Sequence, residues 1–375
     1  MHKAFQYRLY PTTKQATQLK AHLEECRRLY NHFVVDRIQA YQDRGTSLGL
    51  YDQIGRLPFL KTDRPTLKQV HSQVLQNVAV RVDLAFKAFF RRCSEKAGKA
   101  GFPRFKGQGR YDSLTYPQFA TSCRLDHEGL RLSKLGCLRI KQHRPLEGTP
   151  KTCTLQRTTT GKWFASIMCE VEHKPLSEST EAIGIDVGLE KFATLSNGET
   201  IANPRFFRQD EKALAHVNRR LARAPKGTPG RRKARKAVAR VHERTRHRRH
   251  NFAHQKARRL VNRYGLIAVE DLNVKAMVHN RCLAKSISDA AWSQFRQSLS
   301  YKAAEAGRTL VAVNPAYTSQ DCSACGHRLK KALSLRRHMC PCCELDLDRD
   351  ENAARNILRL GLQSQADKPS KSPSL

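Results

Sequence analysis

The sequence has no apolar stretch of about 20 residues, the length that a helix needs to cross a bilayer. Its beginning, residues 1–11, carries charged and polar side chains and lacks the apolar core of a secretory signal peptide. Both observations argue against a membrane protein and against a secreted one. We therefore expect the chain to be cytoplasmic.

Acidic residues are scarce as well. The 375 residues include 33 Asp and Glu against 69 Lys and Arg, which gives a formal net charge of +36 at pH 7. Each Lys or Arg that contacts a phosphate releases a counterion, so nucleic acid is the first partner to expect for such an excess. An anionic membrane surface is the alternative partner, but the chain has no segment that would span it.

Apolar residues make up only 39% of the chain, and no internal repeat is visible. This fraction is still compatible with packed cores, so the chain is not expected to be wholly disordered. The length suggests two to four domains.

The first half has the pattern of a small β domain that a helical segment interrupts. Residues 5–9 alternate between apolar and polar side chains, as in a strand with one buried face. A helical spacing of apolar residues begins at Thr12, with Thr12 or Thr13 as its candidate cap, and a second helical stretch runs from about residue 66 to 97. Residues 112–173 then have the composition of short strands and turns.

The second half begins after a polar, Pro-containing linker at 174–181. A core strand is predicted at 183–188, followed by an antiparallel meander through 202. Residues 201–265 contain 21 Lys and Arg but only 3 Asp and Glu, a net charge of +18. This region predicts two basic helices around a break at 224–230, and their charge indicates a nucleic-acid channel or, alternatively, a solvated face.

Twelve cysteines are present, and four of them form two pairs. Cys322 and Cys325 are separated by two residues, as are Cys340 and Cys343, with fourteen residues between the pairs. Thiolates at this spacing wrap one tetrahedral zinc ion, and no open coordination position is evident, so we predict a structural zinc site. His327 or His338 in place of one cysteine is the alternative, and Cys342 is an extra thiol within the second pair.

Three acidic residues stand in contexts where a lone carboxylate would be costly. Asp186 lies within the apolar strand 183–188, and Glu270 ends the apolar run that begins at Leu266. Because side chains alternate along a strand, only one of Glu270 and Asp271 is expected to point inward. Carboxylates that converge from distant strands can bind a pair of hard divalent cations.

The third acid is Asp350, which has Asp346 and Asp348 as near rivals. The segment 350–354 starts a helical pattern, and we prefer Asp350 because we place it at the N-cap, where its carboxylate would also face the metal cavity.

These motifs together resemble those of the TnpB family. The resemblance rests on Gly184–Gly188, Ile267–Leu272, the paired cysteines and Asp348–Ala354, and it covers nearly the whole chain. Further segments of the family are matched at the expected places: Arg8–Pro11, Leu29–Asn31, Gly101–Lys106, Ser286–Trp292 and Ser319–Cys322. TnpB proteins are encoded by bacterial and archaeal insertion sequences and are related to the type V CRISPR effectors.

The resemblance implies an RNA-guided DNA endonuclease, a prokaryotic enzyme that acts at the nucleoid. Its partners would be a guide RNA derived from the transposon end and a double-stranded DNA target, with one protein per RNA and with no membrane or small-molecule substrate. Asp186, Glu270 and Asp350 would hold two catalytic magnesium ions. Cys322, Cys325, Cys340 and Cys343 would hold one structural zinc ion.

The implied fold is a multidomain α+β architecture. A β-barrel-like wedge domain with a helical insert would precede an RNase H-like (RuvC) α/β nuclease domain with an inserted zinc ribbon. The implied boundaries are 1–14 and 103–175 for the wedge domain, 15–102 for the helical recognition insert, 176–315 and 346–361 for the nuclease domain with basic helices at 205–263, 316–345 for the zinc ribbon, and 362–375 for a disordered tail.

Three other functions remain open from the residues alone. The chain could be an RNA-guided repressor without nuclease activity, an RNase H-like transposase or DNA-binding protein that acts without RNA, or a zinc-ribbon RNA-binding protein. The first predicts a broken acidic triad, and the last leaves the acidic motifs unexplained. The aromatic and basic stretches 102–106 and 111–116 are either base-stacking surfaces or packed rings beside an exposed loop.

Overall fold

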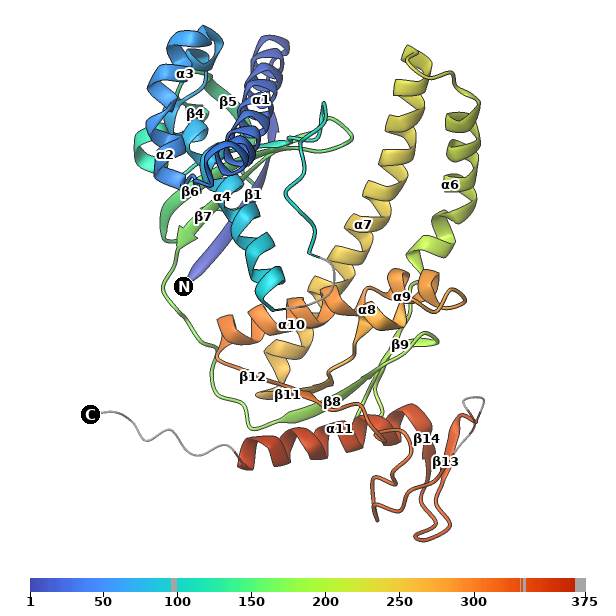
Figure 1. Cartoon of the computed structure of the whole chain (residues 1–375). Coiled ribbons are helices and arrows are strands. Elements are labelled where there is room, and N and C mark those ends of the chain that lie inside the picture. The colour runs from blue at the N-terminus through green and yellow to red at the C-terminus, as the bar shows by residue number, and fades with distance from the viewer. Residues whose placement is uncertain (96–99, 331, 333–334, 368–375) are drawn as a thin grey trace, which may run out of the picture. The chain divides into compact units, whose positions relative to one another are not determined.

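The computed structural model describes residues 1–95, 100–330, 332 and 335–367 (Figure 1). The chain divides into two compact units, Met1–Glu172 and His173–Leu375. Among the described residues, no helix is both long and apolar enough to cross a membrane.

The first unit is built on a seven-stranded antiparallel sheet with the order β2-β6-β7-β1-β5-β4-β3. The central strand β1 follows the predicted alternation, and its apolar residues Phe5, Tyr7 and Leu9 are fully buried. The strands are β1 (His2–Tyr10), β2 (Ser113–Tyr116), β3 (Cys123–Asp126), β4 (Gly129–Leu132), β5 (Gly136–Lys141), β6 (Thr149–Arg157) and β7 (Trp163–Glu170).

The expectation of a barrel-like domain needs correction, because this sheet is not closed. Within the described residues the end strands β2 and β3 pair only with β6 and β4, and not with each other. Each end strand has four residues, and the single-turn helix α5 (Phe119–Ser122) contacts both β6 and β3. A helix therefore occupies the place where a closing ladder would have to form.

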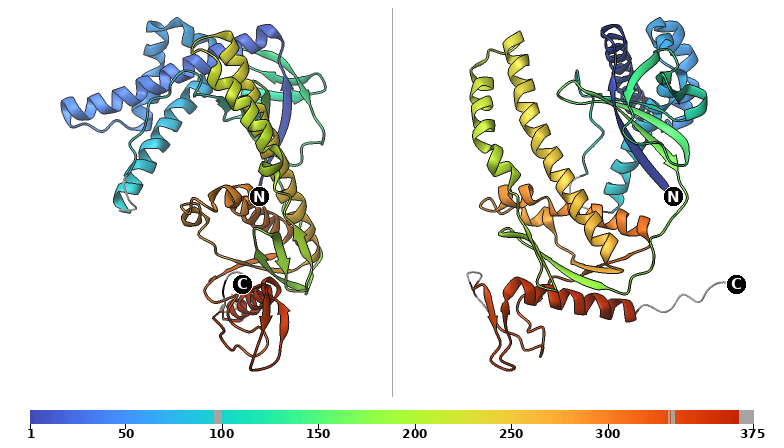
Figure 2. Two further views of the ribbon diagram at one scale, coloured as in Figure 1. Left: turned by 90° about the vertical axis from the view of Figure 1, so that its right-hand side faces the viewer. Right: turned by 180° about the vertical axis from the view of Figure 1, so that it is seen from behind.

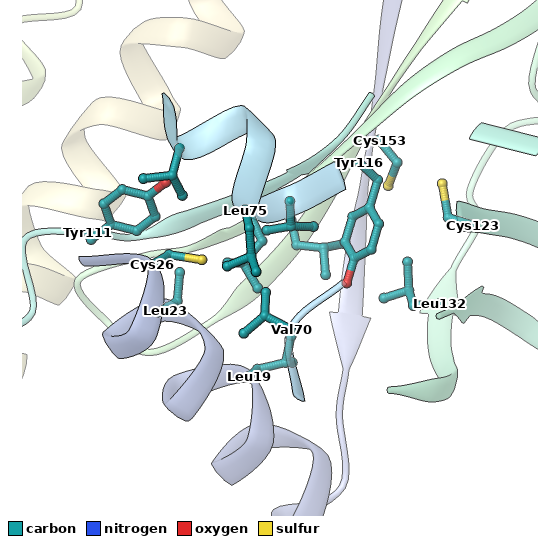
Figure 3. Packing of buried hydrophobic residues seen from close by; sticks show 14 of the residues in the cluster. Leu19, Leu23, Cys26, Val70, Leu75, Tyr111, Tyr116, Cys123, Leu132 and Cys153 are labelled. Carbon is teal, nitrogen blue, oxygen red and sulfur yellow. The ribbon is translucent and has the colours of Figure 1, made fainter. Parts of the chain in front are cut away.

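The helices of the first unit pack on one another and on this sheet. Of the two candidate caps, Thr12 caps the first of them: its Oγ1 accepts from the backbone N–H of Gln15, and the Gln15 side chain accepts from the backbone N–H of Thr12. Figure 3 shows the core between them, where Leu19 and Cys26 of α1 face Leu75 of α4. The helical segments are α1 (Thr13–Arg44), α2 (Leu50–Gly55), α3 (Leu57–Asp63), the 3₁₀ turn η1 (Pro65–Gln69) and α4 (Ser72–Ser94).

The second predicted helix, from about residue 66 to 97, differs from the structure in detail. Its first residues belong to η1, and α4 begins at Ser72 because His71 is extended. The end of the predicted stretch falls on residues 96–97, which lie outside the described residues.

The second unit contains a five-stranded sheet with the order β10-β9-β8-β11-β12. Its first three strands form the predicted antiparallel meander, and β11 and β12 run parallel to β8. The strands are β8 (Ala182–Val187), β9 (Lys191–Leu195), β10 (Thr200–Ala202), β11 (Leu266–Glu270) and β12 (Thr309–Val313).

Helices cover both faces of this sheet (Figure 1). On one face, α7 (Pro229–Arg263) and α10 (Trp292–Ala306) bury Leu260 and Phe295 with Ile185 of β8. On the other, α11 (Arg349–Ala366) buries Ile357 against β11 and β12. Gly184 of β8 allows α11 to approach closely, because a Cβ there would lie 2.1 Å from the carbonyl oxygen of Ala354.

A helical hairpin and four short elements complete the second unit. The helices α6 (Phe206–Arg223) and α7 form an antiparallel hairpin, seen side by side in the right-hand view of Figure 2. They correspond to the two predicted basic helices. The short elements are α8 (Val274–Met277), α9 (Ala284–Ala290), β13 (Arg337–Met339) and β14 (Asp346–Asp348).

The helix α11 continues through Ala366, past the predicted start of a disordered tail at 362. Residues 368–375 of that predicted tail lie outside the described residues.

Candidate active site and metal centre

Two of the three predicted acids lie at the ends of neighbouring strands. Asp186 is near the end of β8 and Glu270 is the last residue of β11. These strands are parallel and paired, with Ile185 opposite Val269, so both acids lie at the same, carboxyl-terminal end of the two strands. Asp350 comes from the first turn of α11, which packs on β8 and β11. The fold thus brings the three acids to one corner of the second unit.

The electrostatics show that these acids interact. The pKa of the Asp186 carboxyl is raised well above its ordinary value, first by burial and then by the negative charges of Glu270 and Asp350. Arg349 opposes that shift only in part. Burial also raises the pKa of Glu270. A cluster that resists carrying its full negative charge is one that a bound cation would stabilise.

The three acids are too widely spaced to surround a single ion. Asp186, Glu270 and Asp350, all within the described residues, do not form a group whose ligand atoms lie within 4.8 Å of one another. Carboxylate oxygens bind Mg²⁺ at about 2.0–2.1 Å, so a single ion would need them closer together. Two ions about 3.5–4 Å apart can join acids that are more widely spaced.

The start of α11 corrects one detail of the sequence prediction. The N-cap is Asp348, and its Oδ1 accepts from the backbone N–H of Asp350 at 2.8 Å. Asp350 is therefore inside the first turn instead of at the cap. The sequence held the signal, because Asp348 is followed three residues later by Glu351, the spacing of a capping box.

Cations surround the acid cluster. Lys191 Nζ lies 2.8 Å from Asp348 Oδ2, and this contact raises the pKa of Lys191. Arg349 Nε lies 3.8 Å from Asp350 Oδ1, and Arg336 Nη1 lies 4.0 Å from the same oxygen. Arg336 also pairs with Glu190 at 3.0 Å. Sequence reasoning did not single out these cations, because nothing local distinguishes them in so basic a chain.

The alternation expected at the end of β11 is confirmed. Glu270 is partly buried, whereas Asp271 is exposed and forms a surface ion pair with Arg296. Thr318 was missed altogether, although its Oγ1 donates to Glu270 Oε1 at 2.6 Å. Thr318 is 48 residues from Glu270 in sequence, so no local pattern could have paired them.

The four paired cysteines meet as predicted. The Sγ atoms of Cys322, Cys325, Cys340 and Cys343 all lie within 4.8 Å of one another. Two of the S···S distances are 3.6 Å and 3.5 Å. Thiolates at about 2.3 Å from a tetrahedral zinc ion are separated by about 3.8 Å, so this cluster fits zinc closely.

The residues near this cluster show which ligand set the structure favours. Cys342 is exposed and does not belong to the four. His327 and His338 are also outside the group, although His338 is fully buried. The structure therefore favours four sulfur ligands over a set that includes histidine.

Among the residues that the structure describes, one other group could hold a metal by distance alone, namely Asp126, Glu128 and Cys137 in the first unit. Asp126 accepts from the backbone N–H groups of Glu128 and Gly129, and Arg131 pairs with both acids. These carboxylates are engaged in a hairpin turn, so we assign the group no function.

The α6–α7 hairpin presents its basic residues outward. Two of its three acids, Asp210 and Glu243, are buried, while most of its Lys and Arg side chains are exposed.

In the first unit, Phe102 packs edge-on against Phe86 and Phe89 and remains 47% exposed. Phe102 is thus both a packed ring and an accessible aromatic surface.

Comparison with known proteins adds to this geometry. A family model described as "Probable transposase" matches residues 166–281, and one described as "Cas12f1-like, TNB domain" matches residues 292–357. A protein of Streptomyces pristinaespiralis, named as a putative RNA-guided DNA endonuclease, is 38% identical over 372 residues, which cover 97% of this chain and 90% of the relative. The chain belongs to the TnpB family.

A second relative agrees with this TnpB assignment. The protein InsQ of Escherichia coli K12, also named as a putative RNA-guided DNA endonuclease, is 32% identical over an alignment of 385 positions, gaps included, that covers 96% of this chain and 92% of the relative. A third family model, described as "Helix-turn-helix domain", matches residues 1–46. In this TnpB-family chain those residues form the strand β1 and the single helix α1 instead.

Among solved structures, a Cas12f1–sgRNA–target DNA complex has a similar fold. The TM-score is 0.58 at 13% identity, and the match covers 92% of this chain and 83% of the other. At this identity the likeness concerns the fold alone. The TnpB-family chain thus has a Cas12-like multidomain α+β fold with two main sheets, neither of which is a closed barrel.

Proposed function

We propose that this chain is an RNA-guided DNA endonuclease of an insertion sequence. It would bind an RNA derived from the transposon end, pair the guide portion with one strand of a double-stranded DNA target, and hydrolyse phosphodiester bonds beside a short recognition motif. One observation carries the proposal: Asp186 and Glu270 lie at the same end of two paired parallel strands, and Asp350 lies in the first turn of the helix packed on those strands. The names of its full-length relatives support the RNA-guided part.

The arrangement of the second unit supports a RuvC nuclease domain. Its mixed sheet places Asp186 and Glu270 at adjacent strand ends, and α11 brings in Asp350 from beyond the cysteine cluster. We assign residues 176–315 and 346–361 to this RNase H-like domain and residues 316–345 to its zinc ribbon. The four cysteines would hold a structural zinc ion that contributes folding energy to a segment with little core of its own.

Each acid has a role in this proposal. Asp186 would contact both magnesium ions, while Glu270 and Asp350 would each complete one of the two sites. Magnesium ions, when bound there, would stabilise negative charge on the attacking and leaving oxygens of the phosphodiester. The chain's own contribution is to hold the carboxylates in place: Thr318 donates a hydrogen bond to Glu270, and the Asp348 cap fixes the turn that carries Asp350.

The partners follow from charge. The α6–α7 hairpin, with its outward Lys and Arg, would contact the phosphates of the RNA or of the RNA–DNA duplex. Base pairing would supply most of the target specificity, because an A-form duplex is read mainly through its backbone and shape.

The test is to express the chain together with its native flanking DNA, purify it in moderate salt and sequence the nucleic acid that stays bound. A single discrete RNA that ends in sequence from beyond the edge of the element is the expected result. That RNA then programs a cleavage assay on a matched DNA target with Mg²⁺ present.

A second candidate function is a transposase that acts without RNA, which the description of the matching family model as "Probable transposase" favours. It predicts heterogeneous RNA or DNA alone in the purified sample, together with strand transfer instead of guided cutting. Such a result would overturn the RNA-guided proposal.

A further inference from the structure

The carboxylate of Glu270 is held by a side chain from outside the sheet. Thr318 lies in the irregular segment between β12 and Cys322, is only 5% exposed, and donates to Glu270 Oε1 at 2.6 Å. We propose that Thr318 is a positioning residue for Glu270, and that the cysteine cluster controls the magnesium site through it. This inference rests on the proposed function.

The hydroxyl of Thr318 has one proton and two neighbouring acceptors. Its Oγ1 lies 2.6 Å from Glu270 Oε1 and 3.1 Å from the carbonyl oxygen of Pro315. A hydrogen bond to an ionised carboxylate is shorter and stronger than one to a neutral carbonyl, so the proton belongs to the contact with Glu270. This hydrogen bond opposes the effect of burial on the pKa of Glu270 and fixes the rotamer of its carboxylate.

Helix α11 is hydrogen-bonded to the segment that carries Thr318 through two asparagine side chains. Asn356 Nδ2 donates to the carbonyl oxygens of Thr318 at 3.0 Å and of Asp321 at 2.7 Å. One turn earlier, Asn352 Nδ2 donates to the same Asp321 oxygen at 2.8 Å, and its Oδ1 accepts from the backbone N–H of Ser323 at 2.9 Å. Both asparagines are almost fully buried. Buried amides with several backbone partners hold a loop in a single conformation.

The cysteine cluster holds the other end of the same segment. Cys322 is the first cysteine of the cluster. Its two neighbours, Asp321 and Ser323, are the residues whose backbone groups bind Asn352. Its backbone N–H donates to the carbonyl oxygen of His327, and its Sγ is 3.6 Å from that of Cys343. A zinc ion at this cluster would therefore fix the backbone four residues after Thr318.

The residue before Thr318 is held in an unfavourable conformation. Tyr317 has φ of +65°, in the left-handed region that a bulky residue rarely adopts. The guanidinium of Arg328 lies over its ring at 3.6 Å, and Arg328 also pairs with Asp321 at 2.6 Å. Such strain persists only where the surroundings impose it, which is typical of functional sites. Arg328, whose guanidinium contacts the Tyr317 ring, belongs to the predicted zinc ribbon.

These contacts connect two of the proposed magnesium ligands, Asp350 and Glu270, to the same helix, α11. Asp350 is in the first turn of α11, and Asn352 and Asn356 on the next turns fix the segment that orients Glu270. Loss of zinc would free that segment at Cys322 and leave it held by Asn352 and Asn356, so the position of Thr318 would become less fixed. The hydrogen bond that orients the buried Glu270 carboxylate would weaken accordingly.

The test uses Mn²⁺ as a spectroscopic probe of the magnesium site in the protein–RNA complex. Thr318→Val removes the hydroxyl at nearly constant volume, and Thr318→Ser keeps it. Asp186→Ala in the same complex gives the background from Mn²⁺ on RNA. We expect Thr318→Val to weaken the site-specific Mn²⁺ binding about tenfold, in the range for residues that orient metal ligands, and Thr318→Ser to bind like the wild type. Zinc content and melting temperature are measured for each variant and are expected to be unchanged.

The outcomes separate this inference from the proposed function. If Asp186→Ala binds Mn²⁺ like the wild type, the magnesium site itself is wrong. Two results would show that Thr318 has no positioning role. In the first, Asp186→Ala loses Mn²⁺ binding but Thr318→Val keeps the full Mn²⁺ affinity. In the second, Thr318→Ser binds Mn²⁺ as weakly as Thr318→Val. Cys325→Ser, assayed below its melting transition, is expected to weaken Mn²⁺ binding as well, and unchanged affinity in a zinc-free, folded protein would overturn the coupling to the cluster.

Discussion

Lys191 and Asp348 form an ion pair with 2.8 Å between Nζ and Oδ2, and the other carboxylate oxygen of Asp348 caps α11. Asp348 thus ties the first residue of β9 to the start of the helix that carries Asp350. Because β9 is hydrogen-bonded to β8, which carries Asp186, two of the proposed metal ligands are held by one short chain of contacts.

Glu270→Gln is expected to abolish DNA cleavage while leaving guide RNA binding intact. The change keeps the shape of the side chain but removes a negative charge that a divalent ion needs. The matched control is Asp271→Asn, which alters the exposed neighbouring acid and should leave cleavage near the wild-type rate. Cleavage of a guide-matched plasmid and RNA binding in a filter assay give the two measurements. Retained cutting by Glu270→Gln would remove Glu270 from the site.

Cys325→Ser is expected to lose zinc and to destabilise the second unit, because a structural zinc site contributes its binding energy to folding. If about 3 kcal/mol is lost, the melting temperature falls by roughly 10 °C for a unit of this size. Cys342→Ser is the control, since that thiol is exposed and outside the cluster. Zinc content and melting curves of the two variants decide the matter. Equal zinc in both would mean that the cluster is not the zinc site.

Gly184→Ala is expected to destabilise the protein by about 3 kcal/mol, the upper range for forcing an atom into a packed interior. A Cβ at this position would lie 2.1 Å from the carbonyl oxygen of Ala354, a backbone atom that cannot move without shifting α11. Gly230→Ala is the control: its Cβ would meet only an ordinary contact at 3.8 Å, and α7 gains from alanine. Urea unfolding of both variants tests this, and equal stability would show that α11 does not pack so closely.

Asp210 should make the stability of the α6–α7 hairpin depend on pH. Burial by itself would raise the pKa of this carboxyl, but hydrogen bonds from Thr245 and Arg244, and the charge of Arg248, outweigh it and lower the pKa below its ordinary 3.8. A lowered folded-state pKa stabilises the fold above the unfolded-state pKa, and the gain disappears as the pH falls through the folded-state value.

Asp210→Asn is therefore expected to cost about 2 kcal/mol at neutral pH, in the range for hydrogen bonds to charged groups. The difference between wild type and variant should shrink as the pH is lowered below about 4. Denaturant unfolding of both proteins across this range measures it. A difference that stays constant with pH would mean that the charge of Asp210 contributes nothing.

The sequence predicted those features that depend on local pattern. Thr12 caps α1 because a Thr-x-x-Gln motif satisfies backbone groups within four residues, and the cysteines meet because their spacing leaves few other arrangements. The short helices α2 and α3 were not predicted, since six or seven residues are too few to show a helical period.

Contacts between distant segments escaped prediction. Thr318 reaches Glu270 only once β11, the segment after β12 and α11 have packed together, and no spacing in the chain encodes that meeting. The open edge of the first sheet likewise depends on where α5 packs, which is set by tertiary contacts and not by the local sequence. Asp348 is a different case. Its capping-box spacing was visible in the sequence, but the prediction placed the neighbouring Asp350 at the N-cap instead.

The order of the acids along the chain has a consequence for synthesis. The α6–α7 hairpin is complete by residue 263, whereas Asp350 follows both the hairpin and the whole cysteine cluster. A growing chain therefore exposes its most basic surface before all three of the proposed metal ligands have been made. Under the proposed function, it would be able to bind RNA before it could cut DNA, so the partner that directs cleavage could be bound before the nuclease is complete.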